Sequence, residues 1–296
     1  MRAWDLVFAA RPMLWLPILS VYLITVHFQS HSDSLGFSDA IKLIAMILIA
    51  AGAYYLNQVH DYESDLTNRK MGFLQNGWLT ERNLMVAYLV CSLAGLLLSS
   101  AGSTWNRLIL LLLFVLGWLY SAPPAKLKDR PLAGLLVDTI VYGLLVPLMA
   151  ASSLHYASWL LAVYFALTVA ATHMLTTMLD QAGDESTGKR TVALVLPATL
   201  VKLLSLGCLL ASVAVAWQAA AAELVYLSIL AATLVAAATV FKSHALLLLA
   251  TKVPLLGLTL LAGFYYGWYL AFVVALILAT RLYYARRFGQ VYPKLA

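Results

Sequence analysis

The sequence is poor in charged residues and in cysteine. Charged side chains account for 11% of its 296 residues, against roughly 25% in a soluble globular domain. This shortage excludes an ordinary water-soluble globule, and the 63% of hydrophobic residues excludes a disordered chain. The two cysteines, Cys91 and Cys208, both lie in apolar runs, so they provide neither a zinc site nor a disulfide framework.

Long apolar runs make up most of the chain. A helix that crosses the hydrocarbon core of a bilayer needs about 20 apolar residues. Leu, Ala and Val dominate these runs, which favours helices over the alternating strands of a membrane β-barrel. We therefore predict an all-α integral membrane protein with a single transmembrane domain, residues 1–296. The predicted spans are 12–30, 38–59, 82–102, 105–122, 132–154, 157–180, 192–217, 220–241, 245–265 and 267–287.

Three connections are long and polar, namely residues 60–81, 121–131 and 180–191. Counting the spans in order places all three on the same face of the membrane. They are also rich in Lys and Arg, so the positive-inside rule predicts that this polar cap faces the cytoplasm. The net charge of +6 is interpreted as setting membrane orientation, and no nucleic-acid partner is predicted.

Acidic residues gather in two of these connections. The first window reads Asn57-x-x-x-Asp61-x-x-x-Asp65 and the second reads Asp180-x-x-x-Asp184. Steps of four residues keep side chains on one face of a helix. Carboxylates near a membrane are costly unless they are paired or bind a metal. Two acidic faces that meet across a bundle would form a set of oxygen ligands that suits Mg²⁺.

Basic residues of the same connections could hold phosphate oxygens beside such a metal. The other interpretation of the acidic residues is that they only solvate loops or cap helices. Two acidic pairs on the same face of the membrane favour a metal site instead. Divalent metal, phosphate and an apolar bundle together indicate a lipid diphosphate as ligand. The candidate diphosphate-binding residues are Arg69, Lys70, Lys126, Lys128, Lys189 and Arg190.

With these motifs in this order, the chain resembles the UbiA superfamily of intramembrane prenyltransferases. The family's N-x-x-x-D-x-x-x-D, Y-S-x-P-P and D-x-x-G-D signatures correspond to residues 57–65, 120–124 and 180–184. The sequence departs from the family pattern at 68–77, where Gly72 stands in place of an expected Arg. Because of this departure, the acceptor is not assigned by analogy with the quinone-making branch of the family.

The resemblance implies transfer of a prenyl chain from an allylic prenyl diphosphate to a lipophilic or aromatic acceptor. It implies a central cavity surrounded by nine helices, whereas the basic C-terminal segment favours an even number, and ten runs are present. It also implies catalytic roles for Asp61, Asp65, Asp180, Asp184 and Tyr120. The implied Mg²⁺ ligands are Asn57, Asp61, Asp65, Asp180 and Asp184, and the ion would neutralise charge on the departing diphosphate.

Five further residues are candidates for the cavity wall. Tyr54, Tyr55 and Tyr142, together with Tyr120, could stabilise an allylic cation through their ring faces, although ordinary packing also explains a tyrosine. Asp138 lies inside an apolar span, where an ionisable residue suggests function. His173 precedes Asp180 by about two turns and could be a base, an acceptor contact or a buried structural histidine.

Two other functions stay open at this point. A terpene cyclase of the same superfamily would quench the cation internally or with water. A non-enzymatic carrier of lipid or ions would use the acidic helix ends to bind a cation. Carriers tend to place ionisable groups near the bilayer midplane, whereas most acids here lie at the edge of the apolar runs.

Overall fold

The computed structural model describes residues 3–30, 33–67, 72–98, 102–151 and 154–293. All regular elements in these ranges are helices, and ten helical stretches are long and apolar enough to cross a membrane. This confirms the predicted all-α membrane fold, with ten candidate spans in the described ranges rather than nine. The first span joins α1 (Ala3–Ala9), η1 (Pro12–Trp15) and α2 (Leu16–Ser30). The others are α3 (Phe37–His60), α5 (Glu81–Leu98), α6 (Thr104–Ser121), α7–η4–α8 (Pro131–Ala150), α9 (Tyr156–Leu179), α12 (Ala198–Gln218), α13 (Ala222–Val240), α14 (His244–Tyr265) and α15 (Gly267–Phe288).

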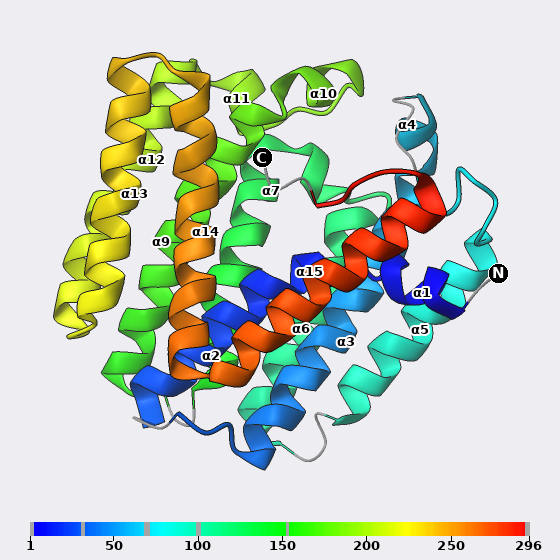
Figure 1. The fold of residues 1–296 in the computed structure, drawn as a ribbon, viewed down its shortest axis with the longest axis horizontal. Helices are drawn as coiled ribbons and strands as arrows, with labels where there is room; N and C mark the ends of the chain where they lie inside the picture. Colours follow the sequence, from blue (N-terminus) through cyan, green and yellow to red (C-terminus); the bar gives the residue numbers. More distant parts are fainter. Residues whose placement is uncertain (1–2, 31–32, 68–71, 99–101, 152–153, 294–296) are drawn as a thin grey trace.

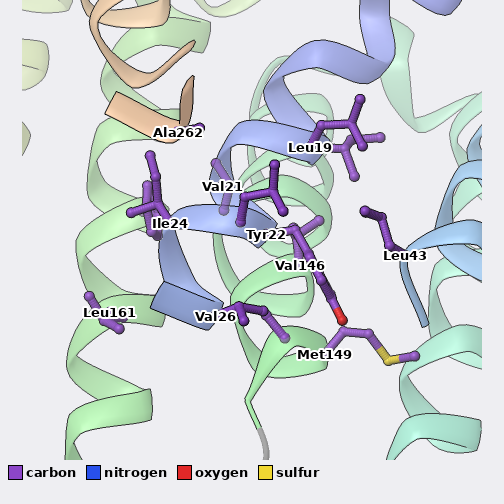
Figure 2. Close-up of a cluster of buried hydrophobic side chains, with 14 of the residues drawn as sticks. Leu19, Val21, Tyr22, Ile24, Val26, Leu43, Val146, Met149, Leu161 and Ala262 are labelled. Carbon is purple, nitrogen blue, oxygen red and sulfur yellow. The ribbon is translucent and has the colours of Figure 1, made fainter. Parts of the chain in front are cut away.

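The spans form a bundle around the central helix α2. Figure 1 shows α9, α12, α13 and α14 on one side and α3, α5 and α6 on the other, with α2 and α15 running obliquely between them. Every residue of α2 from Ile18 to Val26 is buried, as expected for a helix that is apolar on all sides. In Figure 2 its side chains lie between Leu43 and Met149 on one side and Leu161 on the other.

One proline shifts a predicted boundary, and another lies within a predicted span. The predicted span 192–217 begins instead at Ala198, because Pro197 stands before the helix in extended backbone and separates it from the short α11 (Val192–Val195). Pro254, by contrast, lies inside the continuous helix α14. A proline is tolerated within a membrane helix where neighbouring helices satisfy the backbone groups that it frees.

The fifth span is irregular in its middle. It consists of α7 (Pro131–Asp138), the π-helical turn η4 (Thr139–Leu145) and α8 (Val146–Ala150). Gly143 lies in this turn, and a Cβ atom there would come within 2.4 Å of the Ala166 Cα. The missing side chain therefore allows the π-helical turn to pack directly against the backbone of α9. Single π-helical turns are frequent at functional sites.

The three polar connections lie at one end of the bundle, as counting the spans predicts. They contain α4 (Tyr62–Thr67), η3 (Leu127–Asp129) and α10 (Gln181–Ser186). Figure 1 shows α4, α10 and the start of α7 at the same end. The chemistry predicted for these connections therefore has a common location.

A buried ion pair joins the two ends of the chain. Asp5 in α1 has no exposed surface and accepts two hydrogen bonds from Arg287 in α15, at 3.1 and 3.0 Å. It also accepts one from the Tyr283 hydroxyl at 2.6 Å. The Arg287 guanidinium in turn lies 3.7 Å from the ring centroid of Trp78. This contact fixes α1 and the segment before α5 against α15 beside the polar end.

Candidate active site

A cavity of about 480 Å³ lies between the helices. Its wall includes Tyr164 and Thr176 of α9. These residues are twelve positions apart on one helix, so the wall extends about 18 Å along the axis of α9. Leu209, Leu227 and Leu258 line its interior, whereas polar side chains line the part near the polar connections. The shape and lining suit a ligand with a charged head and a hydrocarbon chain.

Asn57 and Asp61 both bind the ammonium group of Lys128 at the polar end of this cavity. The Lys128 ammonium donates hydrogen bonds to Asn57 Oδ1 at 2.6 Å and to Asp61 Oδ1 at 2.5 Å. The Ser121 hydroxyl, at the end of α6, donates a second hydrogen bond to Asn57 Oδ1 at 3.2 Å. The spacing of four residues at the end of α3 places both oxygens on one face, as predicted.

Lys128 is held in place by a short turn between α6 and α7. Lys126 has a left-handed backbone, with φ of 38°, and it reverses the chain into η3. Burial lowers the pKa of the Lys128 ammonium, and the neighbouring Asp61 carboxylate opposes that shift. The side chains of Lys128 and Asp61 are 7% and 14% exposed, so their charges interact with little screening by water.

The second acidic window approaches the same turn. Asp180 ends α9 and is exposed, and Asp184 lies half-buried in α10. The Arg190 amide donates to the Asp129 carbonyl at 3.3 Å, so the segment after α10 is bonded to the turn that carries Lys128. The Lys189 charge is near enough to lower the pKa of Lys128. The turn thus lies between the two acidic windows.

The structure tests whether these residues fit a divalent metal. Among the described residues, no three His, Cys, Asp or Glu side chains converge closely enough to bind one ion. The five-residue ligand set therefore stays a prediction. However, Asn57 and Asp61 already direct two hard oxygens at one positive charge, and Asp65 follows one turn later in α4. Carboxylate and amide oxygens are suitable ligands for Mg²⁺, so the donor chemistry fits.

A second group of polar residues lies deeper in the cavity. The Tyr54 and Tyr142 hydroxyls, from α3 and η4, are 2.9 Å apart. His173 of α9 lies with its Nδ1 2.7 Å from Asp138 Oδ2 at the end of α7. The Tyr120 hydroxyl of α6 is directed at the same Asp138 oxygen, at 3.5 Å. All five side chains line the cavity.

The other predicted diphosphate-binding residues are five basic residues of the polar connections. Lys126 and Lys189 are half-buried, Arg190 is exposed, and Arg69 and Lys70 lie outside the described residues. Sequence reasoning missed Ser121, although it belongs to the Y-S-x-P-P segment. The available signal was its position directly after Tyr120, at the helix end that faces Asn57.

The sequence matches the profile of the UbiA prenyltransferase family over residues 14–253. The chain belongs to this family. It is therefore a transferase, and with its candidate spans it is a multi-pass membrane protein. No curated protein matches the chain in sequence.

Solved structures of other UbiA-like proteins share the fold of this family member. A UbiA homologue from Archaeoglobus fulgidus bound to GPP and Mg²⁺ has a TM-score of 0.67 and 16% identity, covering 88% of this chain and 98% of its own. The same homologue bound to DMAPP and Mg²⁺ has a TM-score of 0.69, 15% identity and coverages of 90% and 98%. A structure described for digeranylgeranylglyceryl phosphate synthase has a TM-score of 0.70, 14% identity and coverages of 87% and 95%.

Proposed function

We propose that this chain transfers a prenyl group from an allylic prenyl diphosphate to a lipophilic or aromatic acceptor within the membrane, with Mg²⁺ as cofactor. The observation that carries the proposal is the pair Asn57 and Asp61, which directs two oxygens at a cation beside a largely apolar cavity. The Archaeoglobus homologue, which shares this fold, binds GPP and DMAPP together with Mg²⁺.

The polar end would bind the diphosphate. Mg²⁺ held there neutralises negative charge on the departing diphosphate. The ligands would come from the two acidic windows, Asn57, Asp61 and Asp65 on one side and Asp180 and Asp184 on the other. The basic residues would bind the remaining phosphate oxygens by charge-assisted hydrogen bonds. They are Arg69, Lys70, Lys126, Lys128, Lys189 and Arg190.

The cavity would hold the prenyl chain and the acceptor. Its aliphatic interior excludes water, which protects an allylic cation from hydrolysis. The rings of Tyr54, Tyr120 and Tyr142 lie in the wall, and each aromatic face that meets a cation contributes about 0.5–2 kcal/mol. Asp138 and His173 lie in the same part of the wall and would contact the acceptor.

The proposed active site faces the cytoplasm. The sequence of the three polar connections supports this orientation, because they are rich in Lys and Arg and their helices α4 and α10 lie at the end of the bundle where the site lies (Figure 1). A cysteine introduced at Arg190, an exposed position of this end, should therefore react with an impermeant maleimide only from the cytoplasmic side. Labelling only from the opposite side would show that the site faces away from the cytoplasm and would contradict this orientation.

The purified protein, incubated with labelled geranyl diphosphate and a panel of acceptors, tests the function. We expect diphosphate release and a prenylated product that both require Mg²⁺ and disappear with EDTA. Asp61→Asn and Asp184→Asn should each lower the rate by about 100-fold or more, because each removes charge that acts on the leaving group.

Two neighbouring acids provide matched controls. Glu63→Gln and Glu185→Gln remove the same charge from the same segments, at exposed positions, and should retain activity. Diphosphate release that needs no acceptor would indicate a cyclase instead. Absence of diphosphate release with every metal and acceptor would contradict the transferase proposal.

A further inference from the structure

An ionisable pair lies inside two membrane-spanning helices and takes no part in the proposed binding of metal or diphosphate. His173 Nδ1 and Asp138 Oδ2 are 2.7 Å apart, and their side chains are 16% and 22% exposed. Both residues line the cavity. Because ionisable groups in a membrane span are costly, a pair that also reaches the cavity calls for a chemical role.

The pair lies at a defined depth below the polar end. His173 precedes Asp180 by seven residues on α9, and Tyr54 precedes Asp61 by seven on α3. Seven residues are about two turns, so each side chain shares a helix face with its acid and lies about 10 Å along the axis from it. The pair and the Tyr54 hydroxyl therefore form a layer between the predicted diphosphate site and the apolar interior. The allylic carbon that reacts is adjacent to the diphosphate, so the acceptor atom must enter this layer.

The hydrogen bond orients the imidazole. His173 Nδ1 lies within hydrogen-bond distance of Asp138 Oδ2. A carboxylate can only accept, so opposite an ionised Asp138 the hydrogen of a neutral imidazole lies on Nδ1, and Nε2 keeps its lone pair. A carboxylate that fixes the tautomer of a neighbouring histidine is the arrangement that makes imidazole a directed base. A basic nitrogen in a largely apolar cavity gains most from a ligand that donates a hydrogen bond. A hydroxyl group provides such a donor, and a carbon–hydrogen bond does not.

We propose that His173, oriented by Asp138, is the general base that takes the hydroxyl proton of the acceptor during prenyl transfer. This inference rests on the proposed function. The allylic carbon–oxygen bond breaks and its electron pair leaves with the diphosphate. The acceptor provides the electron pair of the new bond to that carbon, and its hydroxyl proton moves to Nε2 of His173. The acceptor is thus a phenol or an alcohol, His173 is the catalytic residue, and Asp138 is a positioning residue.

The test separates proton transfer from substrate binding. With geranyl diphosphate, Mg²⁺ and either 1-naphthol or 1-decanol as acceptor, His173→Gln should lower product formation by about 100-fold or more, the range for a lost general base. Binding of the unreactive geranyl thiolodiphosphate should not change. The two acceptors distinguish phenols from alcohols. His155→Gln is the matched control, because it makes the same change at an exposed position at the start of α9.

Two readouts distinguish a base from a structural residue. The defect of His173→Gln should shrink along a series of naphthols with increasingly acidic hydroxyls, since these need less help in losing the proton. Added imidazole should partly restore His173→Ala. Asp138→Asn should lower the rate in a way that is not additive with His173→Gln, because both act on one proton transfer.

The outcomes separate this inference from the proposed function. If the wild-type protein is active and His173→Gln retains its full rate, or if its defect is the same for every naphthol, the base assignment is wrong. If 1-methoxynaphthalene is prenylated as fast as 1-naphthol, the acceptor does not lose a hydroxyl proton and the inference is overturned. If the wild-type protein releases no diphosphate at all, the proposed function itself fails.

Discussion

Replacing Lys128 by methionine should expose a competition between the lysine and Mg²⁺. The ammonium is bonded to Asn57 Oδ1 and Asp61 Oδ1, the two oxygens that we assign to the metal. Removing one partner of a buried ion pair costs about 3–5 kcal/mol, because the other charge stays buried. Since 14% of the Asp61 side chain is exposed to water, we expect the lower end of that range, about 3 kcal/mol.

Mg²⁺ should then stabilise Lys128→Met more than the wild-type protein. In the wild type the ion must displace the ammonium from both oxygens, whereas in the variant that ammonium is absent. A ligand present at about 100 times its Kd adds about 2.7 kcal/mol to the stability of the state that binds it. Saturating Mg²⁺ should therefore recover most of the stability that the substitution removes.

Thermal unfolding in detergent micelles, with EDTA and with Mg²⁺, measures both effects. Lys126→Met is the matched control, because it removes a positive charge from the same turn but leaves the bonds of Lys128 to Asn57 and Asp61 intact. The reasoning is refuted if Lys128→Met in EDTA is as stable as the wild type. It is equally refuted if Mg²⁺ raises the Tm of both proteins by the same amount.

Three further changes test the fold and the cavity. Asp5→Asn should lower the free energy of unfolding by about 3–5 kcal/mol, because it breaks a buried pair. Asp33, the partner of His27, is 70% exposed, so Asp33→Asn should cost less than about 1 kcal/mol. SDS titration followed by circular dichroism compares the two variants. Gly143→Ala should cost about 1–3 kcal/mol by overpacking against α9, while Gly207→Ala, where a Cβ meets nothing within 4 Å, should be neutral or stabilising in the same titration. Ala231 lines the cavity, so Ala231→Phe places a large ring in its interior. The substitution should lower turnover of long prenyl diphosphates more than that of dimethylallyl diphosphate. Equal losses for both substrates would contradict the position that we assign to the prenyl chain.

The sequence predicted the helices well because hydrophobic length is a local property. A run of about 20 apolar residues can satisfy its backbone within a bilayer only as a helix. The predicted spans therefore agree with the structure except where backbone chemistry intervenes. Hydropathy predicts a helix from residue 192, but Pro197 makes this helix begin at Ala198. The π-helical turn at Thr139–Leu145 has no hydropathy signal.

Candidate site residues could be named from the sequence where helical spacing relates them. The four-residue steps from Asn57 to Asp61 and from Asp180 to Asp184 state which side chains share a face, because helix geometry fixes this spacing. Position in the sequence named Tyr54 and Tyr55 alike, whereas in the structure Tyr54 lines the cavity and the Tyr55 hydroxyl bonds the Leu6 carbonyl. The sequence could not state which partners these side chains would meet on other helices.

The sequence alone therefore determined the helical membrane fold, the family resemblance and the two acidic windows, since each depends on neighbours along the chain. Only the tertiary structure decided that Lys128 lies between Asn57 and Asp61, and that Asp138 bonds His173 across 35 residues. Such pairs depend on how helices cross and rotate against one another. That packing is decided by contacts such as Gly143 against α9, which no single segment contains.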